Sequence, residues 1–325
     1  MKIGIISPSS GAMALFPKRV ERGLRWLSAQ GCEVAFGEYA LQHQSYLSAG
    51  ADQRVGDIHD FIDSDTDIVL ASIGGYNSNQ LLPLLDYEKI RQADKVFCGY
   101  SDVTALLLAV AIKGGSRCIY GPTFLPELCE YPEPHRDTVD CLKQILAGKR
   151  AVYSRPELTV SEYIDWADEE NGICRKKAMQ PNPSWTVLQR GTATGAIWGG
   201  NLQTLLWILG TEYFPLSVLD GAIFFFEDLE ENPAILDAML QSLKLRGVFE
   251  RISGLIIGRF VSPALTEQMH CLIPSAVARP DIPILCDVDI GHVSPMLSIP
   301  LGAETVLELS NDIRWETSGF AGRGF

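Results

Sequence analysis

Short apolar runs alternate with amphipathic stretches through the first 120 residues. This pattern limits the possible folds more than any other feature of the chain. Residues 3–7, 34–36 and 67–73 have the length and apolar content of buried strands. Between them, residues 20–30 and 58–63 show the amphipathic pattern of helices. Because alternating strands and helices form βαβ units, the pattern predicts an open, mainly parallel sheet flanked by helices.

The alternation of predicted strands and helices continues further along the chain. Residues 95–98 predict another strand, residues 103–112 an apolar helix that ends at Gly114 and Gly115, and residues 119–122 a strand and turn. We therefore predict an N-terminal α/β domain over residues 1–150.

The pattern weakens between residues 151 and 184, where Pro156, Pro181 and Pro183 interrupt it. We expect this segment to be a linker with some short strands. Beyond it, the pattern predicts strands at residues 194–198, 222–226 and 254–260, and helices at residues 202–209 and 233–246. These elements predict a second, smaller α/β domain over residues 185–325.

Charge and composition exclude several classes of function. The 325 residues carry a formal net charge of -13, which repels the phosphates of nucleic acids and anionic membrane surfaces. No apolar run approaches the roughly 20 residues that span a bilayer. The apolar start of the chain ends at Ser7 and Pro8, too early for a signal peptide. The eight cysteines form no CxxC pair and are not grouped with the five histidines at zinc-like spacing, so we expect free thiols, a cytoplasmic protein and no metal site.

Ser101 stands where a predicted strand turns sharply into a predicted helix. This is the geometry of a nucleophile elbow, in which Gly99 permits the tight turn and the amide of Asp102 points toward a developing oxyanion. The segment departs from the G-x-S-x-G motif at Val103, where the motif has glycine. The alternative is that Ser101 is an ordinary helix N-cap.

Gly74 and Gly75 follow the strand at residues 67–73, at the sheet edge where ligands of open α/β sheets bind. Their flexible backbone allows amides to turn toward a ligand, and they are candidates for a second oxyanion donor. The alternative is a strand-to-helix turn without a ligand.

The second domain contains one candidate for a catalytic acid and a separate candidate for a catalytic base. Glu227 ends the apolar strand at residues 222–226 and is placed to orient a histidine, whereas Asp228 fits the first turn of a helix better. Among the five histidines, His292 alone lies in a predicted loop that contains glycine and proline. This loop follows the apolar run at residues 282–286, and a loop in this position can expose a catalytic base to substrate.

Five motifs, read in order, carry a resemblance to a known family. They are Gly74-Gly75-Tyr76-Asn77, Gly99-Tyr100-Ser101-Asp102, Trp198-Gly199-Gly200-Asn201-Leu202, Phe226-Glu227-Asp228 and Gly291-His292. Together they resemble the LD-carboxypeptidase family of serine peptidases, including its microcin C immunity branch.

The resemblance implies Ser101 as nucleophile, Glu227 as acidic triad member and His292 as base. It also implies an oxyanion hole made by the amides of Gly75 and Asp102. Further implications are two docked domains, a homodimer and no cofactor.

One residue bears on which branch of the family the chain resembles, and therefore on its substrate. Ile73 occupies the position where murein-recycling members carry Arg, which favours the immunity branch and a peptidyl- or aminoacyl-nucleotide such as processed microcin C. Substrate contacts are then expected from Gly74, Tyr76, Asn77, Trp185 and Asn201, with Trp185 stacking on the nucleobase or, alternatively, packing in the core. Two other functions stay open: a murein tetrapeptide LD-carboxypeptidase that releases D-alanine, and a non-catalytic small-ligand binding protein.

Overall fold

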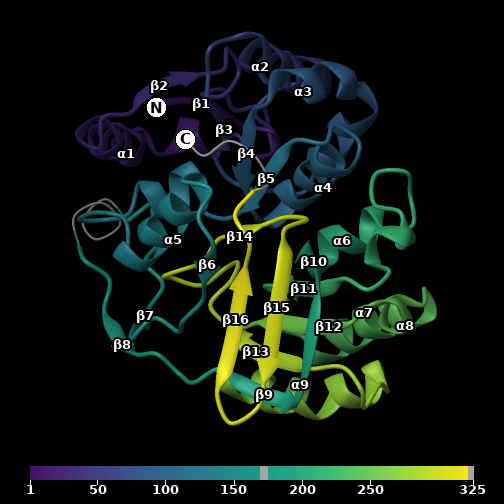
Figure 1. Ribbon diagram of the computed structural model, residues 1–325. Helices are drawn as coiled ribbons and strands as arrows, with labels where there is room; N and C mark the ends of the chain where they lie inside the picture. Colours follow the sequence, from purple (N-terminus) through teal and green to yellow (C-terminus); the bar gives the residue numbers. More distant parts are fainter. Residues whose placement is uncertain (169–174, 261, 321–325) are drawn as a thin grey trace.

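The computed structural model describes residues 1–168, 175–260 and 262–320, and it contains two large sheets that lie one above the other (Figure 1). Residues 169–174 of the predicted linker, and residues 261 and 321–325 of the predicted second domain, lie outside the described residues.

The first sheet is built mainly from the N-terminal residues and has six strands. Its order is β14 (Ile299–Pro300), β5 (Arg117–Tyr120), β4 (Val96–Gly99), β3 (Ile68–Ala71), β1 (Lys2–Ile6) and β2 (Glu33–Phe36). Strands β1 to β5 are parallel, and β14 adds an antiparallel edge strand from near the end of the chain. The C-terminal part of the chain thus contributes to the N-terminal sheet.

Helices cover both faces of this sheet because its strands are apolar on both sides. The helices of this part are α1 (Pro17–Ala29), α2 (Ala51–Asp63), α3 (Tyr87–Ala93), α4 (Thr104–Ile112) and α5 (Arg136–Leu146). A Cβ on Gly4 would lie 2.6 Å from the Phe61 ring, so α2 packs directly on β1. The neighbouring residue Ile3 points to the opposite face, where it lines a cavity together with residues of α1 and α5.

The second sheet has eight strands. Its order is β6 (Ala151–Val152), β16 (Ile313–Thr317), β15 (Glu304–Leu309), β10 (Gly191–Asn201), β11 (Ile223–Glu227), β12 (Gly254–Gly258), β13 (Ile284–Val288) and β9 (Thr186–Gln189). Strands β10 to β13 are parallel, and antiparallel strands complete both edges. The apolar residues of β11 are at most 1% exposed, as expected for a parallel strand covered on both faces.

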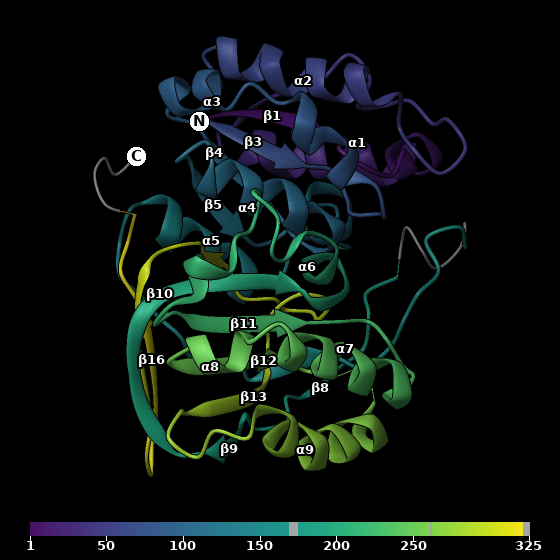
Figure 2. The same ribbon diagram turned by 90° about the vertical axis from the view of Figure 1, so that its right-hand side faces the viewer.

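Helices of the C-terminal part of the chain accompany the second sheet (Figure 2). They are α6 (Leu202–Ile208), α7 (Pro233–Leu245), α8 (Val248–Arg251) and α9 (Pro263–Val277). Helix α6 contacts α4 of the N-terminal domain. The backbone N–H of Asn201, the N-cap of α6, donates to the hydroxyl of Thr104 at the start of α4 (3.0 Å), so the two domains pack together there.

The predicted linker contains short strands. Strand β6 joins the edge of the second sheet, while β7 (Leu158–Val160) and β8 (Met179–Pro181) form a separate antiparallel pair. The predicted α/β fold class, a parallel sheet flanked by helices with a second sheet domain, is confirmed. Within the described part of the chain, none of the helices is long and apolar enough to cross a bilayer.

Candidate active site

Ser101 occupies the sharp turn between β4 and α4, in a strained backbone conformation. Its φ is 63°, in the left-handed region that a non-glycine residue rarely adopts without surrounding constraint. A Cβ on Gly99 would lie 2.9 Å from a side-chain carbon of Val103, so the tight turn requires glycine there. Val103, not Ser101, occupies the N-cap position of α4. The hydroxyl of Ser101 is therefore not used to cap the helix.

The glycine loop after β3 lies against this serine. A Cβ on Gly74 would stand 2.8 Å from Ser101 Oγ and 3.4 Å from the amide nitrogen of Asp102. Gly75 has a φ of 153°, and a Cβ there would lie 2.2 Å from Ser9 Oγ. Only glycine fits at this position.

Ser9, which the sequence analysis did not single out, fixes the rest of the glycine loop. Its hydroxyl oxygen accepts hydrogen bonds from the backbone N–H groups of Tyr76 (3.0 Å) and Asn77 (3.2 Å). The loop is thereby held at the sheet edge beside Ser101.

Glu227, at the end of β11, is 2% exposed and has both carboxylate oxygens occupied. Oε2 accepts from the backbone N–H of His292 (3.1 Å) and contacts its ring Nδ1 (2.7 Å). Oε1 accepts from the Tyr120 hydroxyl (2.6 Å) and from the Asn201 side-chain amide (3.3 Å). Because Tyr120 belongs to the first sheet and the other two partners to the C-terminal part of the chain, both domains hold the carboxylate in position.

His292 links this carboxylate to Ser101. Its Nε2 lies 3.0 Å from Ser101 Oγ. Because a carboxylate only accepts, Nδ1 carries the ring proton and Nε2 is left to accept from the serine hydroxyl. Gly291 precedes the histidine with a φ of 72°, and a Cβ there would lie 2.1 Å from Glu227 Cδ. The loop can approach the acid only because this residue is glycine.

Electrostatics favour the charged acid and a basic histidine. Burial by itself lowers the pKa of His292, but the charge and hydrogen bond of Glu227, together with the charges of Glu127 and Asp228, outweigh it and raise that pKa above its ordinary value. Burial by itself raises the pKa of Glu227, yet the contacts with His292 and Tyr120 bring it below its ordinary value. The arrangement can stabilise an imidazolium that forms when a proton leaves the serine.

A second, half-buried carboxylate, Glu127, is linked to the imidazole through Tyr100. The Tyr100 ring packs edge-on against the His292 ring at a centroid distance of 4.9 Å, and its hydroxyl donates to Glu127 Oε1 (2.8 Å). Glu127 also accepts from the backbone N–H and hydroxyl of Thr123, and burial raises its pKa. Glu127 was not predicted from the sequence, because no local pattern points to it. Tyr120 was also missed, although its place at the carboxyl end of β5 is a signal for it.

The residues predicted to contact substrate have different surroundings. Tyr76 is 69% exposed, and its ring lies 6.5 Å from the half-exposed ring of Trp207. Asn201 is buried: its amide donates to Glu227, and its side-chain oxygen caps α6 by accepting from the Thr204 N–H.

Trp185 was predicted to stack on a nucleobase or, alternatively, to pack in the core. Its side chain is buried, packs beside Trp315 and donates its indole N–H to Asp289 Oδ2 (2.8 Å). These contacts are those of a tryptophan in the core with a satisfied indole N–H, as in the packing alternative.

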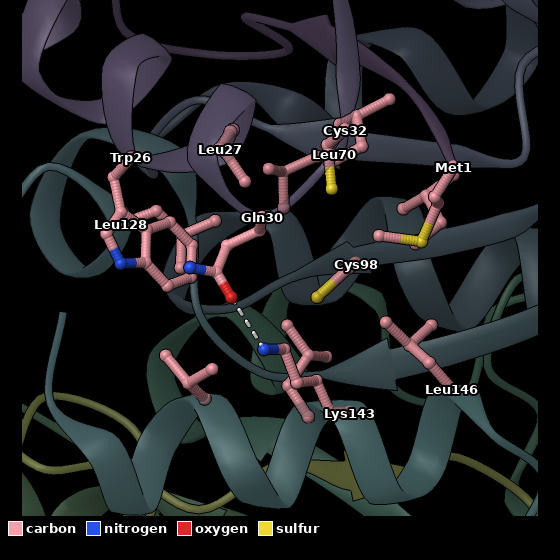
Figure 3. Close-up of a pocket in the computed structure, with 14 residues that line it drawn as sticks. Met1, Trp26, Leu27, Gln30, Cys32, Leu70, Cys98, Leu128, Lys143 and Leu146 are labelled. Atoms are coloured by element: carbon pink, nitrogen blue, oxygen red, sulfur yellow. Dashed lines mark hydrogen bonds between the residues drawn. The ribbon is translucent and has the colours of Figure 1, made fainter.

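The cavity between α1, α5 and the first sheet is separate from this site (Figure 3). It has a volume of about 60 Å³ and an apolar lining that includes Trp26, Leu70 and Leu146, with Lys143 donating to Gln30 beside it. None of the predicted site residues lines it.

Comparison with known proteins decides the family. The profile of the LD-carboxypeptidase N-terminal domain matches residues 3–121, and that of the LD-carboxypeptidase C-terminal domain matches residues 194–307. The chain belongs to the LD-carboxypeptidase family. Membership makes it a serine peptidase or carboxypeptidase-like hydrolase, as the motifs predicted.

Individual members of the LD-carboxypeptidase family match nearly the whole chain. The microcin C7 self-immunity protein MccF of Escherichia coli is 32% identical over 95% of this chain and 91% of its own. The murein tetrapeptide carboxypeptidase of Pseudomonas aeruginosa is 25% identical over 97% of this chain and 95% of its own. A solved structure of MccF in complex with aspartyl sulfamoyl adenosine is 30% identical and superposes with a TM-score of 0.89, covering 99% of this chain and 97% of that one.

Proposed function

We propose that Ser101, His292 and Glu227 form a catalytic triad that hydrolyses an amide-type bond in a small peptide-like molecule. The observation that supports this most strongly is the continuous hydrogen-bonded series from Glu227 Oε2 through the imidazole to Ser101 Oγ. Ser101 belongs to the first sheet domain, while the other two residues belong to the second. Catalysis therefore depends on the docking of the two domains.

The proposed reaction has two stages. Ser101 Oγ attacks the scissile carbonyl carbon while its proton passes to His292 Nε2, and Glu227 stabilises the resulting imidazolium. The tetrahedral intermediate then breaks its carbon–nitrogen bond, and the leaving nitrogen takes the proton from His292. Water next attacks the acyl-enzyme with His292 again as base, which releases the acid and restores the serine hydroxyl.

The amides of Gly75 and Asp102 are the proposed oxyanion donors. The nearness of the glycine loop to the Asp102 amide and to Ser101 Oγ supports this role. Loss of one such donor typically costs on the order of 3 kcal/mol of transition-state stabilisation. No metal or organic cofactor is needed for this chemistry.

For the substrate, we propose a peptidyl- or aminoacyl-nucleotide such as processed microcin C. Similarity to MccF supports this class, since the MccF structure with aspartyl sulfamoyl adenosine holds an aminoacyl-nucleotide analogue. Ile73, where murein-recycling members carry Arg, points the same way. The exposure of Tyr76 beside the glycine loop supports a substrate contact for it, and we expect Gly74 and Asn77 to border that contact.

The second candidate is a murein tetrapeptide LD-carboxypeptidase that releases D-alanine. The full-length similarity to the Pseudomonas aeruginosa murein tetrapeptide carboxypeptidase favours it. Both candidates use the same proposed triad and differ only in the substrate that the site accepts. We further propose that the protein is cytoplasmic and forms a homodimer; light scattering of the purified chain would test the homodimer.

Parallel incubations distinguish the two substrates. The wild-type protein and Ser101→Ala are each incubated with aspartyl sulfamoyl adenosine and with murein tetrapeptide, and products are followed by mass spectrometry. Wild-type release of aspartate with no release by the mutant supports the nucleotide proposal. Faster release of D-alanine from tetrapeptide would favour the carboxypeptidase instead.

A further inference from the structure

We propose that Asp289 is a positioning residue for catalysis: together with strand β7 it clamps the loop of residues 289–295 that carries His292. The inference rests on the proposed role of His292 as the base. It assigns a function to the 151–184 segment, which the catalytic chemistry itself does not use.

Asp289 is the first anchor of this loop, and its side chain is fully buried. Oδ2 accepts from the Trp185 indole N–H (2.8 Å). Oδ1 accepts from the Asn182 amide (3.0 Å) and from the guanidinium of Arg259. Its backbone oxygen accepts from the N–H of Leu297 (2.7 Å), which closes the base of the loop. Two of the three side-chain donors come from residues 182–185, at the end of the predicted linker and the start of the second domain.

Strand β7 forms the second anchor, on the other side of the histidine. The backbone oxygen of Ser294 accepts from the N–H of Val160 (2.8 Å) and from the hydroxyl of Thr159 (3.1 Å). Arg259 connects the two anchors, since the guanidinium that binds Asp289 also donates to the Thr159 hydroxyl (3.3 Å).

His292 therefore lies three residues after one anchor and two residues before the other. Between them, Gly291 sits so close to Glu227 that the loop cannot move inward. Outward movement must break hydrogen bonds of buried groups, which is costly because such groups find no water to replace the lost partner. The clamp keeps Nε2 within hydrogen-bond distance of Ser101, where a displacement of about 1 Å can cost roughly a hundredfold in rate.

Asp289→Asn tests the clamp, because the amide keeps the shape of the side chain but turns one acceptor into a donor that opposes either Trp185 or Arg259. Asp287→Asn is the matched control: Asp287 is also buried, lies two residues away on β13, and pairs with His270 (3.0 Å) rather than with the linker. The rate of Ser101 labelling by a fluorophosphonate is measured against pH, alongside thermal stability.

We expect Asp289→Asn to label ten- to a hundredfold more slowly, with the pH midpoint of labelling shifted down as contact between His292 and Glu227 loosens. Asp287→Asn should stay within threefold of wild type with an unchanged midpoint. A wild-type rate and midpoint in Asp289→Asn, or equal effects in both variants, would overturn the clamp.

A milder variant covers the case in which Asp289→Asn does not fold. Trp185→Phe removes a single donor to Asp289, so labelling should slow two- to fivefold with a midpoint shift in the same direction. An unchanged rate and midpoint in this variant would also overturn the inference. Absence of labelling in the wild type itself would instead refute the proposed triad, so the two failures are distinguishable.

Discussion

The sharpest prediction concerns the two adjacent acids at the end of β11. Glu227→Gln places an amide where one oxygen now accepts from the ring and backbone N–H of His292 and the other from Tyr120 and Asn201. If the amide nitrogen faces His292, it opposes the backbone N–H and favours the tautomer with the proton on Nε2. That tautomer cannot accept the serine proton.

The size of the effect follows from this geometry. An acid-to-amide change that imposes the wrong histidine tautomer lowers kcat about 10⁴-fold in a serine protease triad, or about 5 kcal/mol of transition-state stabilisation. Because Glu227 is fully buried and contacts His292 in the same way, we expect a loss of about 10³- to 10⁴-fold here. Substrate affinity should change little.

Asp228→Asn is the matched control for this change. Asp228 accepts from the backbone N–H groups of Gln203 (2.9 Å) and Glu230 (2.8 Å), and neither partner belongs to the proposed triad. Its rate should stay within about tenfold of wild type, measured as steady-state turnover or as Ser101 labelling. Equal losses in the two variants would refute the assignment of Glu227 as the acid that faces the imidazole.

Three further predictions follow from the same contacts. Activity should fall as pH decreases, with a midpoint above about 6.5, because Glu227 raises the pKa of His292 and only the neutral imidazole acts as base; a midpoint below 6.5 in a kcat/KM profile would contradict this. Gly291→Ala should lower turnover at least a hundredfold through the clash with Glu227, whereas Gly31→Ala, at a similar φ of 75° with open space around its Cβ, should cost about 1 kcal/mol of stability and leave turnover unchanged. Trp185→Ala should lower the free energy of unfolding in urea by about 3–5 kcal/mol, and a raised KM with unchanged stability would restore the stacking role.

Much of the site was predictable from local sequence because two triad residues stand at the ends of recognisable elements and the third, His292, lies in a loop that follows one. Ser101 follows a buried strand and precedes an apolar helix, and Glu227 ends a run of three phenylalanines. In α/β sheets such positions gather at the carboxyl edge. The structure brings the predicted serine, acid and histidine together at that edge.

The supporting contacts were not predictable, because they join residues far apart in the chain. Trp185 and Asp289 are 104 residues apart, and no local pattern tells that the indole N–H has a buried carboxylate as its partner. Strand β14 pairs with β5 in a register that joins Ile299 to Tyr120, although these two residues lie far apart in the chain. Periodicity identifies elements, but pairing between distant elements is decided by packing of the whole chain.

The labelling site of a fluorophosphonate tests the central claim most directly. The intact protein is treated with the reagent, digested, and the modified residue is located by mass spectrometry, with Ser101→Ala treated in the same way. The account predicts one adduct, on Ser101, that is absent from the mutant and forms much more slowly in Glu227→Gln. An unlabelled wild type, or an adduct that persists in Ser101→Ala, would contradict the proposed nucleophile.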